Sequence, residues 1–245
     1  MSTPVFWMDG ERLRAGDVLD LDSDEGHHAA VVRRIRRGEY VDVTDGAGHL
    51  ARCVVVDVNK RGLSCEVQSR SDVPPPAPRV TVVQALPKGD RGELAVELMT
   101  EVGVDAITPW AASRCITQWK GERGAKSLRR WRSSVREAAK QSRRAWFPDV
   151  TELATTSAVA EMLGTAAMAL VLHESAARGV GELTPPLDGD IVLVVGPEGG
   201  ITDDEIDQFG AAGGVVVRLG PTVLRTSTAG AVAAGVLLAR TARWG

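Results

Sequence analysis

Two short apolar runs near the C-terminus, each leading into a Gly-Pro loop, constrain the fold more than any other feature of the chain. Residues 191–195 run into the loop 196–200, and residues 215–217 run into a loop that contains residues 220–221. Short β-branched runs without polar alternation are typical of strands buried on both faces of a parallel sheet that helices cover. Ligands of open α/β sheets bind at the carboxyl ends of strands, so we expect the chemistry at these two loops.

A helix-start signal follows each of the two loops. Thr202 and Glu205 have the spacing of a capping box, in which the hydroxyl and the carboxylate bond amides of the first helical turn. Residues 226–228 open a helix of small residues that is expected over 229–242. The order of strand, glycine loop and helix therefore occurs twice, which is typical of an α/β fold.

A proline-rich connector over residues 73–78 divides the chain. Four prolines in six residues cannot continue a helix or a central strand, so the segment is expected to be a stiff, extended linker. Residues 1–72 before it predict a small β-rich barrel. The elements expected there are strands over 5–8, 40–44, 50–59 and 63–68 and a short helix over 27–34.

After the connector, residues 79–245 alternate between strand and helix patterns. This alternation predicts a second domain with a mostly parallel sheet and helices on both of its faces. In addition to the two signature strands, we expect strands over 80–85, 106–109, near 150 and over 167–172, and helices over 91–102, 125–144 and 159–163.

Positive charge is concentrated in two segments. Residues 33–37 hold four arginines, and residues 120–144 hold ten basic residues against two acidic ones. A row of cations at helical spacing favours binding of a nucleic acid, and a solvated helix face is the alternative. The row consists of Arg129, Arg132, Arg136, Lys140 and Arg143, and an apolar stripe with Leu128, Trp131 and Val135 runs beside it.

The sequence argues against several other classes of protein. Its N-terminus lacks the apolar core of a secretion signal, and the apolar stretch 229–239 falls short of the roughly 20 residues of a membrane span. Cys53, Cys65 and Cys115 are scattered without C-x-x-C spacing, so we expect neither a metal site nor a disulfide framework. No P-loop or dinucleotide-binding glycine motif occurs. We therefore expect a cytoplasmic protein.

Several motifs together carry a family resemblance. H-E at 173–174, G-P-E-G-G at 196–200 and L-G-P-T-V-L-R-T at 219–226 follow one another along the chain. In this order they resemble the bacterial 16S rRNA (uracil-N3)-methyltransferases, a branch of the SPOUT superfamily. Upstream, H-H at 27–28 and D-G at 45–46 are similar to that family's PUA-like domain, and K-G-D-R at 88–91 and E-A-A-K-Q-S at 137–142 to the start of its catalytic domain.

The resemblance implies an α/β domain with a trefoil knot that works as a homodimer and binds S-adenosylmethionine in the knot. It also implies a substrate uridine in 16S rRNA, within the small ribosomal subunit. The residues that would bind the cofactor are Leu172, His173, Gly196, Glu198, Gly199, Gly200, Ile201, Leu219, Gly220, Val223, Leu224, Arg225, Thr226 and Thr228.

Catalytic and RNA-binding roles can be assigned to individual residues as expectations. Glu198 is the only acid inside a signature loop and is the candidate base; acceptance of hydrogen bonds from loop amides is its alternative role. Arg225 is the candidate cation, or else a structural contact. The family commonly has an acid where this chain has Ser227, so no acid–base role is transferred there. The residues expected to contact RNA are His27, Arg33, Arg34, Arg36, Lys88, Arg91, Arg114, Arg129, Arg132, Arg136, Lys140 and Arg143.

Three other functions remain open at this point. A sister SPOUT enzyme that methylates a ribose 2′-oxygen of tRNA or rRNA would have the same cofactor pocket. A non-catalytic RNA-binding factor in ribosome assembly would keep the fold without the chemistry. A dinucleotide-dependent dehydrogenase is disfavoured because its glycine motif is missing.

Overall fold

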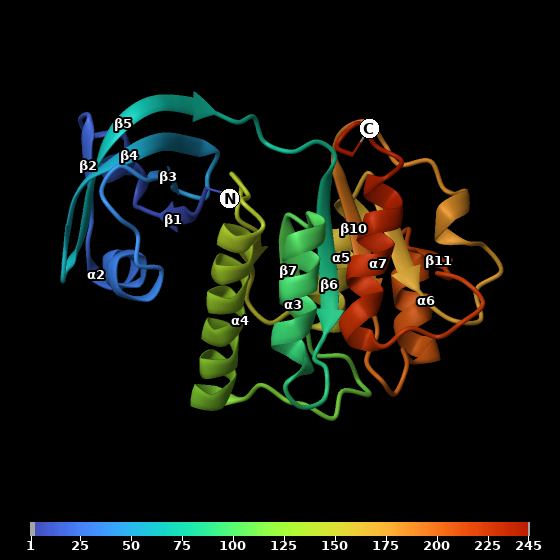
Figure 1. Cartoon of the computed structure of the whole chain (residues 1–245). Coiled ribbons are helices and arrows are strands. Elements are labelled where there is room, and N and C mark those ends of the chain that lie inside the picture. The colour runs from blue at the N-terminus through green and yellow to red at the C-terminus, as the bar shows by residue number, and fades with distance from the viewer. Residues whose placement is uncertain (1–2, 245) are drawn as a thin grey trace. The chain divides into compact units, whose positions relative to one another are not determined.

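The computed structural model describes residues 3–244 and divides them into two compact units. The first unit comprises residues 3–75 and 139–147, and the second comprises residues 76–138 and 148–244. Figure 1 follows the chain from the β-rich first unit, in blue, to the helices and strands of the second unit, which end in red.

The first unit is built on one five-stranded sheet with strand order β1-β3-β4-β5-β2. Strand β1 pairs with β3 in parallel, and every other pair is antiparallel. The prediction of a β-rich unit is confirmed, whereas β2 and α1 were not expected from the sequence. The elements are β1 (Val5–Trp7), α1 (Gly10–Arg14), β2 (Val18–Leu21), α2 (Ser23–His27), a π-helical turn η1 (His28–Val32), β3 (Tyr40–Thr44), β4 (His49–Asn59) and β5 (Gly62–Asp72).

A short segment distant in sequence belongs to the first unit. Residues 139–147, which were expected in the second domain, pack within the first unit instead. The amide of Phe147 donates to the carbonyl of Gly46, and the ammonium of Lys140 lies 2.6 Å from a carboxylate oxygen of Glu25. These partners lie 101 and 115 residues apart along the chain, so no local pattern indicates the contacts.

The second unit contains a six-stranded, wholly parallel sheet with strand order β11-β9-β10-β6-β7-β8. The predicted α/β architecture is therefore confirmed. The strands are β6 (Arg79–Ala85), β7 (Ala106–Trp110), β8 (Asp149–Val150), β9 (Met168–Leu172), β10 (Asp190–Val195) and β11 (Val215–Val217). The helices are α3 (Arg91–Val102), α4 (Gly121–Gln141), α5 (Thr156–Thr165), α6 (Asp203–Ala211) and α7 (Thr226–Leu238), with a 3₁₀ turn η2 (Val180–Glu182).

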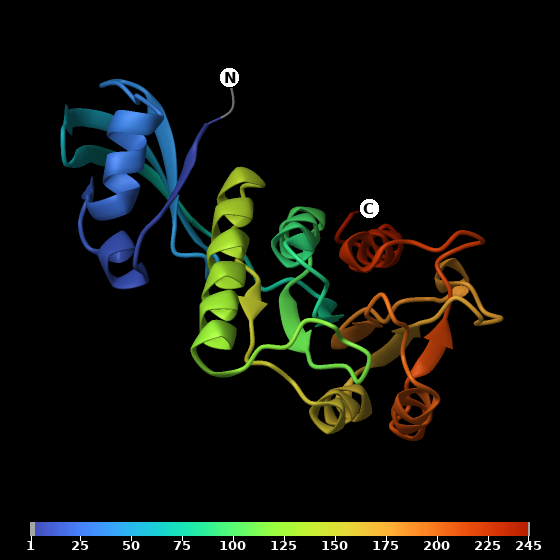
Figure 2. The same ribbon diagram turned by 90° about the horizontal axis from the view of Figure 1, so that it is seen from below.

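Helices cover both faces of this sheet. Figure 2 shows α3, α4 and α7 along one face and α5 and α6 along the other. Alternate residues of one strand face opposite layers: Val82 of β6 packs in the core beneath α3 and α7, and Val83 packs in the core with Phe209 of α6. Because both faces are covered, these strands need no polar alternation, as the apolar runs predicted.

Helices α4, α5 and α7 differ from their predicted bounds, and α5 runs from Thr156 to Thr165 where 159–163 was expected. Helix α7 begins at Thr226 and ends at Leu238, whereas the small-residue pattern predicted 229–242. Helix α4 ends at Gln141, so Arg143 lies beyond it with a φ of 55°. Helix α6 begins at its predicted capping box, with Thr202 and Glu205 each accepting the expected backbone hydrogen bond.

Candidate functional site

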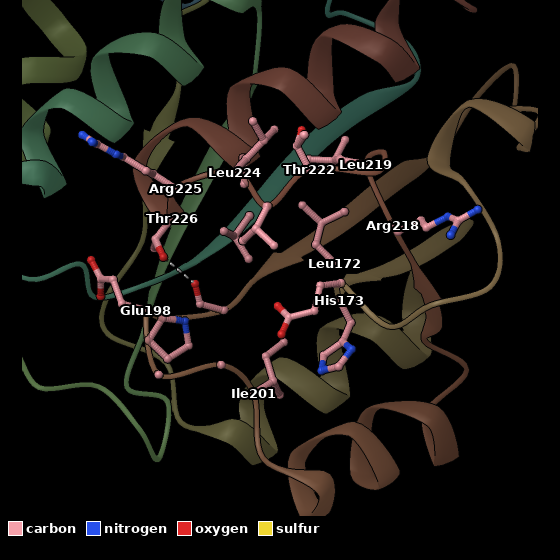
Figure 3. Close-up of a pocket in the computed structure, with 18 of the residues that line it drawn as sticks. Leu172, His173, Glu198, Ile201, Arg218, Leu219, Thr222, Leu224, Arg225 and Thr226 are labelled. Atoms are coloured by element: carbon pink, nitrogen blue, oxygen red, sulfur yellow. Dashed lines mark hydrogen bonds between the residues drawn. The ribbon is translucent and has the colours of Figure 1, made fainter.

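A cavity of about 610 Å³ opens at the carboxyl ends of β9, β10 and β11. Its walls come from residues 172–174, 195–201 and 218–226, joined by Arg91, Arg114 and Ala229. In the sheet β9 lies between β10 and β11, so its end separates the two Gly-Pro loops. Figure 3 shows Leu172 and His173 between Ile201 of one loop and Leu219 of the other.

The loop 196–201 is held in a defined conformation by hydrogen bonds. The hydroxyl of Thr226 donates to the carbonyl of Gly196 over 3.2 Å, which ties the loop to the first residue of α7 (Figure 3). The amide of Gly200 donates to the carbonyl of Pro197 over 2.9 Å and closes a turn. Gly200 has a φ of 76°, in the left-handed region that favours glycine.

The loop after β11 leaves open space at a glycine. A β-carbon added at Gly220 would have no heavy atom within 4 Å, although the residue lines the cavity. Apolar side chains of Leu172, Leu219 and Leu224 line the same cavity, and glycine and proline backbone supplies polar edges. Apolar walls with a few polar groups are typical of small-molecule sites.

The charged residues of the lining are mostly cationic. The lining contains four arginines and two carboxylates. They are Arg91, Arg114, Arg218 and Arg225, and Glu174 and Glu198. Glu198 is exposed, and its Oε1 accepts a hydrogen bond from the amide of Lys88 over 3.1 Å. The alternative role of Glu198, as acceptor for a loop amide, is therefore observed in the structure.

His173 extends the pairing of β9 beyond its last residue. Its amide donates to the carbonyl of Val217 over 2.9 Å. The ring atom Nδ1 lies 2.8 Å from the hydroxyl of Ser175 and accepts a longer bond from the Ser175 amide. Both contacts are local and orient the imidazole.

A buried carboxylate lies in the element that follows the loop 196–201. Glu205 is 3% exposed, and burial by itself would raise its pKa. Hydrogen bonds from the amides and hydroxyls of Thr202 and Ser113 outweigh burial, and they hold the pKa of Glu205 below its usual value of 4.5. The carboxylate is therefore ionised at neutral pH.

The structure brings together nearly all of the residues predicted to bind the cofactor. Thirteen of the fourteen line the cavity, and Thr228 does not; its hydroxyl donates to the carbonyl of Arg225 over 3.1 Å instead. Several lining residues were missed although they lie next to predicted ones in the sequence: Glu174, Val195, Pro197, Arg218, Pro221, Thr222 and Ala229.

The residues predicted to contact RNA do not form one group. His27, Arg33, Arg34 and Arg36 are exposed in the first unit, and Lys88, Arg129 and Arg136 are exposed in the second. Arg91 and Arg114 line the cavity. Arg132 is exposed but bonds Glu152 and the carbonyl of Val150. Lys140 differs from the expectation, because it is 6% exposed and pairs with Glu25.

Two structural features are absent from residues 3–244. No helix in this range is long and apolar enough to cross a membrane. No group of three or more histidines, cysteines, aspartates or glutamates within the same residues is arranged to hold a metal ion.

Comparison with known families matches most of the chain. Residues 74–238 match the family described as RNA methyltransferase domain, and residues 21–68 match the RNA methyltransferase PUA domain. A protein of Mycobacterium tuberculosis named ribosomal RNA small subunit methyltransferase E is 52% identical over 233 residues, which is 94% of this chain and 89% of the relative. The Bacillus subtilis protein of the same name is 28% identical, over 89% of each chain.

Solved structures resemble the whole chain. A ribosomal RNA small subunit methyltransferase E from Neisseria gonorrhoeae, bound to S-adenosyl methionine, has a TM-score of 0.84 at 30% identity and matches over 97% of each chain. A protein of Legionella pneumophila in complex with the cofactor SAM has a TM-score of 0.86 at 28% identity. It matches over 98% of this chain and 99% of its own.

Proposed function

Since the chain belongs to the RNA methyltransferase family, we propose that it transfers a methyl group from S-adenosylmethionine to N3 of a uridine in 16S rRNA of the small ribosomal subunit. One observation carries the proposal: a single cavity gathers the residues of both signature loops, in a fold shared with proteins crystallised with this methyl donor. Relatives named for the small subunit rRNA support the choice of substrate.

The cavity fits S-adenosylmethionine in size and lining. Its volume of about 610 Å³ lies within the roughly 300–1,000 Å³ that is usual for small-ligand sites. Leucines on its walls suit a flat purine, and backbone amides and carbonyls of the loops can pair with the edge of the base. Residues 196–201, 219–226 and Leu172 would hold the adenosyl group.

Positioning is the main task of the protein in this reaction. The bound donor supplies a methyl group on a positively charged sulfur, and its transfer requires donor and acceptor in line. The uridine N3 is on the base-pairing edge, so the base must be unpaired or turned out of its stack. The cavity, fixed by the Thr226–Gly196 hydrogen bond, would orient both molecules.

The N3 proton must leave before or during transfer. Arg225, an exposed cation of the lining, would stabilise the negative charge that develops on the uracil ring. Glu198 is the candidate base, although its carboxylate also accepts the Lys88 amide. Ser227 is 3% exposed at the start of α7, which supports leaving it without an acid–base role.

The homodimer, the trefoil knot and the cytoplasmic location stay proposals drawn from the resemblance. Two apolar side chains of the second unit are exposed in a way that fits a homodimer. Val223, which lines the cavity, is 77% exposed, and Val232 on α7 is 44% exposed. A second copy of the chain would cover such side chains. Light scattering at several protein concentrations measures this directly, with twice the mass of 26.0 kDa as the expected result.

Nucleoside mass spectrometry tests the proposed reaction. Small subunits that lack the modification are incubated with the protein and methyl-labelled S-adenosylmethionine, and the 16S rRNA is then digested to nucleosides. We expect the label in N3-methyluridine. Label on a ribose oxygen would favour the sister activity, and unlabelled RNA together with normal RNA binding would favour an assembly factor.

Removal of a single surface arginine is expected to weaken RNA binding through charge alone. The change Arg33→Ala should lower the slope of log K against log salt by about one unit without altering sequence preference. Arg33 is exposed in the arginine cluster of the first unit. The matched control Arg12→Ala removes an exposed arginine that pairs with Asp22 at 3.1 Å and should leave the slope unchanged. Equal slopes for the two variants would show that Arg33 in the arginine cluster does not contact RNA phosphates.

A further inference from the structure

Glu205 bonds more than the start of its own helix. Its Oε2 accepts hydrogen bonds from the amide and the hydroxyl of Thr202, both over 3.0 Å, and this completes one side of the capping box. Its Oε1 accepts the amide of Ser113 over 2.8 Å and lies 3.4 Å from the hydroxyl of Thr156. A cap uses one carboxylate oxygen, so the second oxygen is directed to the loop after β7.

The residue after Ser113 in turn holds the loop 196–201. The guanidinium of Arg114 donates to the carbonyl of Gly199 over 3.2 Å and lies 3.5 Å from the carbonyl of Ile201. A β-carbon added at Gly199 would lie 3.1 Å from Cβ of Arg114 and 3.2 Å from its carbonyl oxygen. The loop after β7 therefore packs directly against the glycines that line the cavity.

These contacts form a closed ring. It runs from Glu205 to Ser113, on to Arg114, across to Gly199 and Ile201, and back through Thr202 to Glu205. Glu205 and Ser113 do not line the cavity, whereas Arg114, Gly199 and Ile201 do. Because the carboxylate is buried and ionised, it fixes its donors more firmly than a neutral acceptor would.

We infer that Glu205 is a positioning residue of the cofactor site, and that it sets the loop 196–201 through its hydrogen bond to the Ser113 amide and through Arg114. The inference rests on the proposed function, since S-adenosylmethionine is the ligand whose loop is positioned. Without the Ser113 bond, the loop 196–201 is less constrained before the cofactor binds. Binding must then order the loop, which lowers the affinity for S-adenosylmethionine.

Proline at position 113 removes the amide that donates to Glu205. Ser113 occupies the second position of a turn closed by the bond from the Cys115 amide to the Ala112 carbonyl, a position that favours proline. Ser113→Pro thus deletes the amide donor and leaves Glu205 and its cap in place. Ser113→Ala is the matched control, because it keeps the amide and, like proline, lacks the Ser113 hydroxyl that also bonds Glu205.

Titration calorimetry with S-adenosylmethionine tests the inference on the full chain. We expect the Kd to rise about tenfold for Ser113→Pro and to stay within about twofold of the parent for Ser113→Ala. Glu205→Gln should also weaken binding, because its amide group must face one of two N–H donors. The double variant Ser113→Pro/Glu205→Gln should bind no more weakly than Glu205→Gln, because proline removes one of the two N–H donors that the glutamine amide group must otherwise face.

Steady-state kinetics separates positioning from general loss of structure. The KM for S-adenosylmethionine should rise in Ser113→Pro while the KM for the RNA substrate is unchanged. A Ser113→Pro variant that binds like Ser113→Ala, or additive effects in the double variant, would overturn the inference. If Ser113→Pro does not fold, the Kd for S-adenosylmethionine is compared between Glu205→Gln and Thr202→Ala, which alters the cap and keeps the Ser113 bond. A higher Kd for Glu205→Gln would support the inference, and equal values would overturn it. A parent protein that binds no S-adenosylmethionine contradicts the proposed function instead.

Discussion

Replacement of Gly220 by leucine is expected to abolish S-adenosylmethionine binding while the chain stays folded. A β-carbon at this position meets no protein atom within 4 Å, so the first atom of the added side chain has room. Because Gly220 lines the cavity, we expect the leucine side chain to extend into the space where the cofactor would lie. We expect the Kd measured by calorimetry to rise at least about 100-fold, which corresponds to about 2.7 kcal/mol.

A second glycine supplies the control. Gly210 in α6 is exposed, has no heavy atom near its added β-carbon and does not line the cavity. Gly210→Leu should therefore bind S-adenosylmethionine as the parent does, and both variants should melt close to the parent temperature. Tight binding by Gly220→Leu would mean that the cofactor does not occupy this cavity.

The change Arg243→Ala is expected to have the largest effect on stability. The guanidinium makes two bonds to the carboxylate of Asp105, at 2.6 and 3.0 Å, and also donates to the carbonyls of Gly103 and Pro78. Both side chains are largely buried, at 15% and 6% exposure. Removal of one partner from a buried pair leaves an uncompensated charge and costs about 3–5 kcal/mol. The melting temperature should fall by roughly 6–20 °C.

An exposed ion pair of the same unit is the matched comparison. Glu152 pairs with Arg132 at 2.9 Å, with side-chain exposures of 79% and 47%. Glu152→Ala should change the free energy of unfolding by no more than about 1 kcal/mol, since solvent screens the pair. Equal losses in Glu152→Ala and Arg243→Ala, measured by denaturant unfolding, would contradict the larger stabilisation expected from the buried Asp105–Arg243 pair.

Local pattern was enough to predict most elements of the second unit. Helix α3 begins and ends at the predicted residues, and β6, β7, β9 and β10 differ by one residue or less at each end. Their apolar runs are buried on both faces, so hydrophobicity alone marks them. Helix α7 was less well placed, because its small residues continue past Leu238 without a pattern that marks its end.

The loop residues of the site were predictable because they follow strands in a known order. Gly196, Gly220 and their neighbours were placed by motif, and the cavity contains nearly all of them. Their arrangement in space was not predictable, since β9 lies between β10 and β11 in the sheet and is earlier than both in the sequence.

Two long-range polar contacts could not be predicted from local pattern. Lys140 matched the cationic stripe of its helix, yet Glu25, 115 residues away, pairs with it in a buried position. Glu205 was recognised as a helix cap, but its bond to Ser113 spans 92 residues. Helical periodicity and capping rules describe near neighbours only, so they could not indicate either contact.

A crystal structure of the chain with S-adenosylmethionine tests the central claim most directly. We predict that the purine lies between the loops 196–201 and 219–226, against Leu172, with its polar edge toward backbone amides and carbonyls. A purine bound outside this cavity, or a cavity that stays empty at saturating cofactor, would contradict the account.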